Sequence, residues 1–215
     1  MGITVENQYL SGNVYGNSLT LNRPAGVQVG DTMLAHVFIN VGGATITPQA
    51  GWTTIRGGGT PALGVFLHVA TASEPTSYTF SFSGSQYSQG AIQNFRGVDT
   101  SQPQDVTANQ NTATGTTPAS LATTTQTAND LLAWFCLFPG GGTLAMPAGT
   151  TSQYNFVLFY GMGLATVALP SPGAVSAQDG VLSVSQNWQV TEVMLKPSVQ
   201  GGSPLGSLGL LHVGR

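Results

Sequence analysis

Three histidines are the side chains best suited to proton transfer in this sequence: His36, His68 and His212. An esterase-like enzyme would place one of them beside a serine and an aspartate in a pocket. The chain has no Gly-x-Ser-x-Gly turn of the kind that exposes a nucleophilic serine in α/β-hydrolases. His36 and His68 fall inside expected strands, where a histidine usually has a structural role. We therefore expect no catalytic residues and a protein that is not an enzyme.

Eight acidic residues offer the other route to chemistry. Asp31 and Asp130 each stand just before an apolar segment, a place that suits an aspartate closing a turn with backbone N–H groups. Asp99 and Asp105 flank a short polar stretch, and calcium would need more oxygen ligands than this pair supplies. The glycine triplets at 57–59 and 140–142 lack the Lys-Ser/Thr of a phosphate-binding loop. We expect no metal and no cofactor.

The single cysteine excludes a disulfide within the chain and a cysteine-based metal site. Cys136 lies in the apolar run 131–138, without the basic or helix-terminal surroundings that activate a thiol. It is expected to be buried and inert.

Aromatic residues near the ends of expected strands offer a binding chemistry instead. A carbohydrate-binding module, for instance one for host adhesion, would present Trp52 or Trp188 as an exposed stacking surface beside polar groups. Tyr87 and Tyr154 lie at similar places, whereas Trp134 falls within the apolar run and is expected in the core. An aromatic side chain in a sandwich is more often core than platform. Glycan binding is therefore kept as the alternative function.

Charge is scarce, at 6% of residues and a net −3, against the usual quarter. The five basic residues are scattered along the chain, so we expect neither nucleic acid nor an anionic membrane as a partner. No signal peptide and no apolar run of 18 residues is found, which predicts synthesis in a cytoplasm without export. So little surface charge gives little protection against association, as in a lattice of copies.

The last residues differ from the rest. A Gly/Ser/Pro linker follows Pro197 and leads into an apolar tail, so we divide the chain into a domain at 1–197 and a linker and tail at 198–215. Exposed apolar area is unfavourable in water. The tail is therefore expected to dock on a neighbouring molecule through five aliphatic residues: Leu205, Leu208, Leu210, Leu211 and Val213.

Short segments rich in β-branched and aromatic residues are separated by frequent turn-forming glycines and prolines, a pattern that predicts an all-β chain. At 77–83 the apolar residues Tyr78, Phe80 and Phe82 alternate with polar ones, which is typical of a strand with one buried face. Patterns recur at an offset of about 98–100 residues, as in Gly30-Asp31 and Asn129-Asp130. We expect an antiparallel two-sheet β-sandwich, jelly-roll-like, from an internal duplication. The expected strands are 3–7, 18–22, 31–40, 52–56, 63–72, 77–83, 90–96, 120–125, 130–138, 152–156, 158–169, 181–186 and 189–196.

Two sequences are distinctive together: VATASEPTSYTF at 69–80 and FRGVD at 95–99, with Gly30-Asp31 and Gly51-Trp52 upstream. Over about residues 25–197 the chain resembles a β-sandwich module of bacterial and phage proteins that occurs in surface, tail-associated or capsid-associated chains. The resemblance implies a virion protein, a capsid decoration or minor tail subunit. The partners of such a subunit would be other virion proteins and copies of itself. Closed symmetric assembly is usual for such subunits, and we expect a trimer.

Overall fold

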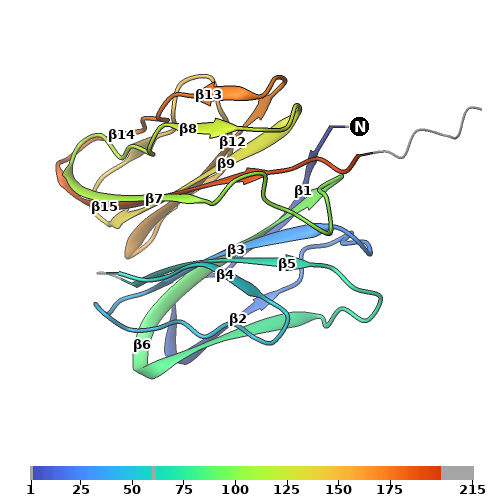
Figure 1. Cartoon of the computed structure of the whole chain (residues 1–215). Helices are drawn as coiled ribbons and strands as arrows, with labels where there is room; N and C mark the ends of the chain where they lie inside the picture. Colours follow the sequence, from blue (N-terminus) through green and yellow to red (C-terminus); the bar gives the residue numbers. More distant parts are fainter. Residues whose placement is uncertain (1, 60–61, 200–215) are drawn as a thin grey trace, which may run out of the picture.

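Antiparallel strands make up most of the described chain, residues 2–59 and 62–199 of this computed structural model. Two main sheets lie face to face (Figure 1). The expected all-β sandwich is thus confirmed. The five tail residues from Leu205 to Val213 lie outside the described residues.

The first sheet is formed entirely by the first half of the chain. Its strand order is β1-β6-β3-β5-β4, and β2 pairs with the first part of the long strand β6. The strands are β1 (Thr4–Leu10), β2 (Val14–Asn22), β3 (Thr32–Ile39), β4 (Thr53–Gly58), β5 (Ala62–Val69) and β6 (Ser77–Arg96).

The second sheet repeats that arrangement with the second half of the chain, in the order β7-β15-β9-β12-β11. Two short two-stranded sheets, β8 with β13 and β10 with β14, complete this half. The strands are β7 (Asn109–Gly115), β8 (Thr123–Thr125), β9 (Asp130–Pro139), β10 (Leu144–Ala145), β11 (Thr151–Val157), β12 (Tyr160–Leu169), β13 (Gly173–Val175), β14 (Val181–Leu182) and β15 (Gln186–Leu195).

The sequence repeat is therefore a structural repeat. Strands β1, β6, β3, β5 and β4 correspond in order to β7, β15, β9, β12 and β11. Even a β-bulge recurs: the pairing of β4 with β5 shifts between Thr54 and Arg56, and that of β11 with β12 shifts between Ser152 and Tyr154. The chain completes one sheet before it starts the other, whereas in a jelly roll it passes between the sheets repeatedly.

The two repeats join where their last strands end. Val98 and Pro197 form an antiparallel bridge. The Asp99 N–H donates to the Lys196 carbonyl, and the Ser198 N–H donates to the Gly97 carbonyl. Equivalent segments therefore pair with each other, as they do across a local two-fold axis.

Three apolar clusters stabilise this arrangement. The central one lies between the sheets and takes residues from both halves, among them Phe38, Phe95 and Phe135. Each outer face is covered as well, on the first sheet by β2 and the first part of β6, and on the second by β10 and β14. Strands β3 and β9 are consequently buried on both faces along almost their whole length.

Candidate functional site

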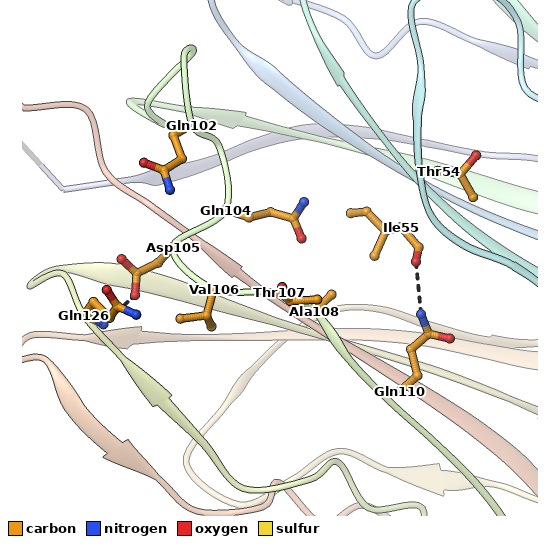
Figure 2. Close-up of a pocket in the computed structure, with 10 residues that line it drawn as sticks. All are labelled: Thr54, Ile55, Gln102, Gln104, Asp105, Val106, Thr107, Ala108, Gln110 and Gln126. Carbon is orange, nitrogen blue, oxygen red and sulfur yellow. Dashed lines mark hydrogen bonds between the residues drawn. The ribbon is translucent and has the colours of Figure 1, made fainter.

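A polar groove lies where the chain crosses from the first repeat to the second. One side is β4 at its bulge, and the other is the segment 102–110 that leads into β7 (Figure 2). A bulge bends its strand and leaves backbone groups without ladder partners. The Ile55 carbonyl, which lies within this bulge, accepts a hydrogen bond of 3.0 Å from Gln110 Nε2 of the opposite sheet. A hydrogen bond between the two sheets therefore spans the groove.

The groove has a volume of about 620 Å³ and is lined mainly by carboxamides and hydroxyls. Figure 2 shows Gln104 pointing across it toward Ile55. Carboxamides both donate and accept hydrogen bonds, so this lining suits an uncharged polar ligand. The lining residues are Thr54, Ile55, Gln102, Gln104, Asp105, Val106, Thr107, Ala108, Gln110 and Gln126.

Asp105 is the one charged residue in that lining, and it is nearly buried. Burial alone would raise its pKa, but hydrogen bonds from the Gln126 N–H and the Thr127 hydroxyl hold the pKa below the usual value. Its neighbour Asp130 receives no N–H or O–H donor on either oxygen. Burial and the negative charge of Asp105 raise the pKa of Asp130 to about 7. When protonated, Asp130 can donate to the Asp105 carboxylate, and of this pair Asp105 lines the groove.

A second feature is an exposed aromatic ridge, defined here as Tyr15, Tyr87, Leu158 and Phe159. The Tyr15 and Tyr87 rings meet edge to face with centroids 5.0 Å apart, and Tyr87 stacks on Phe159 at 5.4 Å and 14°. Their side chains nevertheless remain 64%, 43% and 60% exposed, in the order Tyr15, Tyr87, Phe159. The ridge is therefore ordered by contacts among its own rings while its outer surface faces solvent.

The ridge combines parts of both repeats. Tyr15 and Tyr87 are cross-strand partners on β2 and β6, and Leu158 and Phe159 form the turn between β11 and β12. Beside them is a mainly apolar hollow of about 390 Å³, lined by Gly12, Asn13, Leu158 and Phe159. Large exposed apolar patches on soluble proteins mark interaction surfaces.

Trp52 and Trp188 do not present the exposed stacking surface expected of the carbohydrate-binding alternative. They are 8% and 5% exposed and belong to the two outer apolar clusters. Trp52 packs against His68, Tyr78 and Phe80, so its ring faces are occupied. The strands that cover the outer faces bury both rings. Tyr154 is also buried, and of the four aromatics considered from the sequence only Tyr87 is exposed.

Neither described histidine meets a serine. His36 is fully buried, its Nδ1 lies 3.1 Å from the Tyr154 hydroxyl, and burial with the nearby Arg56 charge lowers its pKa to about 3. His68 has Nδ1 2.8 Å from the Gly51 carbonyl oxygen and Nε2 2.9 Å from the Glu74 carboxylate. The contacts of both rings are those of structural residues. His212 lies outside the described residues.

The remaining polar residues singled out from the sequence have partners within the fold. Asp31 accepts from the Gln28 N–H and from Asn94 and Arg96, and Asp99 accepts from the N–H groups of 101 and 102. Among residues 2–59 and 62–199, no group of three or more His, Cys, Asp or Glu could hold a metal ion. Cys136 is buried, and burial raises the pKa of its thiol.

The sequence singled out Tyr87 but not the aromatic ridge, because the other members are scattered at positions 15, 158 and 159. One signal was present: Leu158-Phe159 follows Val157 without a polar interruption, which is unusual for an exposed turn. The polar groove had no such signal, since glutamines occur throughout the chain.

No protein-family model matches this chain, and neither curated proteins nor solved structures give a significant match. Within the described ranges, no helix has the length and apolarity that a membrane crossing needs.

Proposed function

We propose that this protein is a non-enzymatic structural subunit of a phage particle, a capsid decoration or tail-associated protein that acts through protein–protein contacts. The observation that carries the proposal is the aromatic ridge. Tyrosine and phenylalanine are enriched in the cores of protein interfaces, where charged residues are depleted. The ridge provides these residue types in an ordered, solvent-exposed arrangement.

The rest of the molecule supports a role in presenting surfaces. The central strands β3 and β9 are buried by three apolar clusters, and the described histidines are hydrogen-bonded within the fold. Because the chain has few charged residues, little electrostatic repulsion opposes close packing of its copies. The resemblance of the sequences at 69–80 and 95–99 to a phage and bacterial module gives the proposed location, the virion.

The test is the solution mass of the full chain, measured by light scattering over a concentration series. We expect association that weakens in the ridge variant, Tyr15→Ser with Phe159→Ser. The matched control is Val29→Ser with Leu121→Ser, which removes exposed apolar side chains outside the ridge and should leave association unchanged. A full chain that is monomeric at every concentration, or a ridge variant that associates like the parent, contradicts the proposal.

The carbohydrate-binding alternative is favoured by one observation, the amide-lined groove. A glycan microarray with the full chain separates the two functions. Under the proposed structural role, no glycan binds. Saturable binding of a glycan that is lost in Gln104→Ala, with the fold retained by circular dichroism, would instead identify the groove as a carbohydrate site.

A further inference from the structure

We propose that the aromatic ridge and its hollow receive the apolar C-terminal segment, residues 205–213, of a second copy of this chain. The proposal rests on the proposed function and specifies its contact: copies associate head to tail, the tail of one on the ridge of the next. The occupant is inferred from where the described chain ends, how far the remaining residues reach, and what both surfaces are made of.

The ridge and the start of the tail lie at opposite ends of the sandwich. Strand β9 shows this, since its residue Pro139 pairs with Tyr160 beside the ridge, whereas Leu131 pairs with Leu195, just before the chain leaves the fold. In Figure 1 the last described residues leave on the right, and the bend of β6 lies on the left. The ten residues of β9 span roughly 33 Å at about 3.3 Å per residue.

The tail is too short to cover its own ridge well. Leu205 is six positions beyond Val199, which is at most about 22 Å of extended chain at about 3.3–3.6 Å per residue. Leu205 therefore stops short of the ridge of its own molecule. Leu208 also falls short when extended, whereas Leu210, Leu211 and Val213 have enough chain to arrive. The full set of five aliphatic residues therefore cannot lie on the ridge of its own molecule. A neighbouring copy has no such restriction.

The two surfaces are chemically matched. Residues 205–211 contain four leucines and no charged residue, and Val213 extends the apolar set. The hollow beside the ridge is mainly apolar, and its edge is formed by Leu158 and Phe159. Burial of aliphatic side chains against aromatic rings removes apolar area from water on both sides. Gly12 lines the same hollow, and the space where a Cβ would stand is open within 4 Å, so backbone can approach closely there.

A tail-to-ridge contact uses two different surfaces, so it is heterologous. Such contacts generate a ring if the rotation between copies closes and an open chain if it does not. A copy with a defective tail and a copy with a defective ridge can therefore form one tail-to-ridge contact with each other, and no more.

The test mixes two full-length variants. The tail variant, Leu208→Ser with Leu211→Ser, keeps an intact ridge, and the ridge variant, Tyr15→Ser with Phe159→Ser, keeps an intact tail. Each alone is expected to be monomeric. The equimolar mixture is expected to form a 1:1 dimer that grows no further, because each has only one working surface. Light scattering after size exclusion measures the masses.

A labelled peptide of residues 201–215 gives a second measurement that does not depend on assembly. We expect saturable binding to the tail variant, and binding weakened at least about tenfold when Phe159→Ser is added. Circular dichroism shows that each variant is folded. Peptide binding that Phe159→Ser leaves unchanged overturns the inference.

The outcomes distinguish this inference from the proposed function. A tail variant that associates like the parent chain while the ridge variant does not would overturn the tail as occupant and leave the ridge as the contact surface. A mixture that stays monomeric although the parent associates also overturns the tail-to-ridge contact. Unchanged association of the ridge variant contradicts both proposals.

Discussion

At the scale of single residues, the two repeats place the same acid in opposite surroundings. Asp31 and Asp130 stand at the entrance of β3 and β9. Asp31 is met by Arg96, whose Nη2 lies 2.8 Å from the carboxylate. Lys196, the basic residue at the same place in the second repeat, contacts Gln102 and Asp99 instead. Asp130 is left beside another acid.

This difference gives Asp130→Asn an unusual pH dependence. The pKa of Asp130 is about 7 in the folded chain and near 3.8 when unfolded, so its contribution to stability falls as pH rises from about 4 to 7. An asparagine needs no proton and can still donate to Asp105. We expect Asp130→Asn to raise the free energy of unfolding by about 2–4 kcal/mol above pH 7, at about 1.4 kcal/mol per pH unit, and little at pH 4.

Asp31→Asn is the matched control, with the opposite sign. Burial raises the pKa of Asp31, but the hydrogen bonds from Arg96, Asn94 and the Gln28 N–H outweigh it and hold the pKa below 3.8. Its contribution is present above the unfolded pKa and lost as pH falls through the folded one. Asp31→Asn should cost about 1–3 kcal/mol at pH 7 and less at pH 3. Urea unfolding across pH measures both, and parallel profiles would refute this assignment.

At the scale of elements, the paired bulges determine which side chains cross between the sheets. Arg56 and Tyr154 each follow a bulge, and each points into the opposite sheet. Arg56 Nη1 donates to the Val190 carbonyl at 2.9 Å, and Nη2 donates to Gln189 Oε1 at 2.7 Å. Tyr154 reaches His36 in the same way. A bulge reverses the alternation of side chains along its strand, which is how a polar residue comes to face the core.

Arg56→Met tests that cross-sheet contact. The methionine fills much of the same volume but removes the four hydrogen bonds that the Arg56 guanidinium donates, so we expect a loss of about 1–3 kcal/mol in the free energy of unfolding. Tyr154→Phe removes a single hydrogen bond at the equivalent place and should cost about 1 kcal/mol. Urea denaturation followed by circular dichroism gives both values. Equal stability of Arg56→Met and the parent would show that the bonds to β15 contribute nothing.

The alternation of apolar and polar residues predicted most strands and the repeat. It did not predict burial where a residue is covered by strands that are distant in the sequence. Tyr78, Phe80 and Phe82 share a buried face as the alternation at 77–83 predicts. The same pattern could not show that β6 continues as one strand from Ser77 to Arg96. It also could not place Trp52 and Trp188, because the strands that cover them are distant in the sequence or too short to have a period. The exposed ridge depends on packing between repeats.

At the scale of the whole molecule, the two sheets share one core. Phe38 and Phe95 of the first repeat pack in one cluster with Phe135 and Leu195 of the second. Neither repeat buries this face alone. A single cooperative transition is therefore expected for the described domain, as small domains with one core usually show.

Tryptophan fluorescence can test this cooperativity because the repeats carry different tryptophans. Trp52→Phe leaves only the second repeat's indoles, and Trp134→Phe with Trp188→Phe leaves only that of the first. Within each variant, the urea midpoint by fluorescence should equal the midpoint by far-ultraviolet circular dichroism. This internal comparison removes any effect of the substitution on overall stability. Two separated midpoints in either variant would show that the repeats unfold independently.

The bridge between Val98 and Pro197 indicates how a chain with two such repeats could have evolved. The segments that end the two repeats pair antiparallel, and each donates one N–H to the other. That is the geometry of an isologous interface between identical subunits. In evolutionary terms the molecule has the form of a homodimer whose subunits were joined end to end. After fusion the two halves no longer need to present identical surfaces. The ridge combines strand residues of the first half with a turn of the second, and an exact symmetric dimer would have carried two identical copies of any such surface.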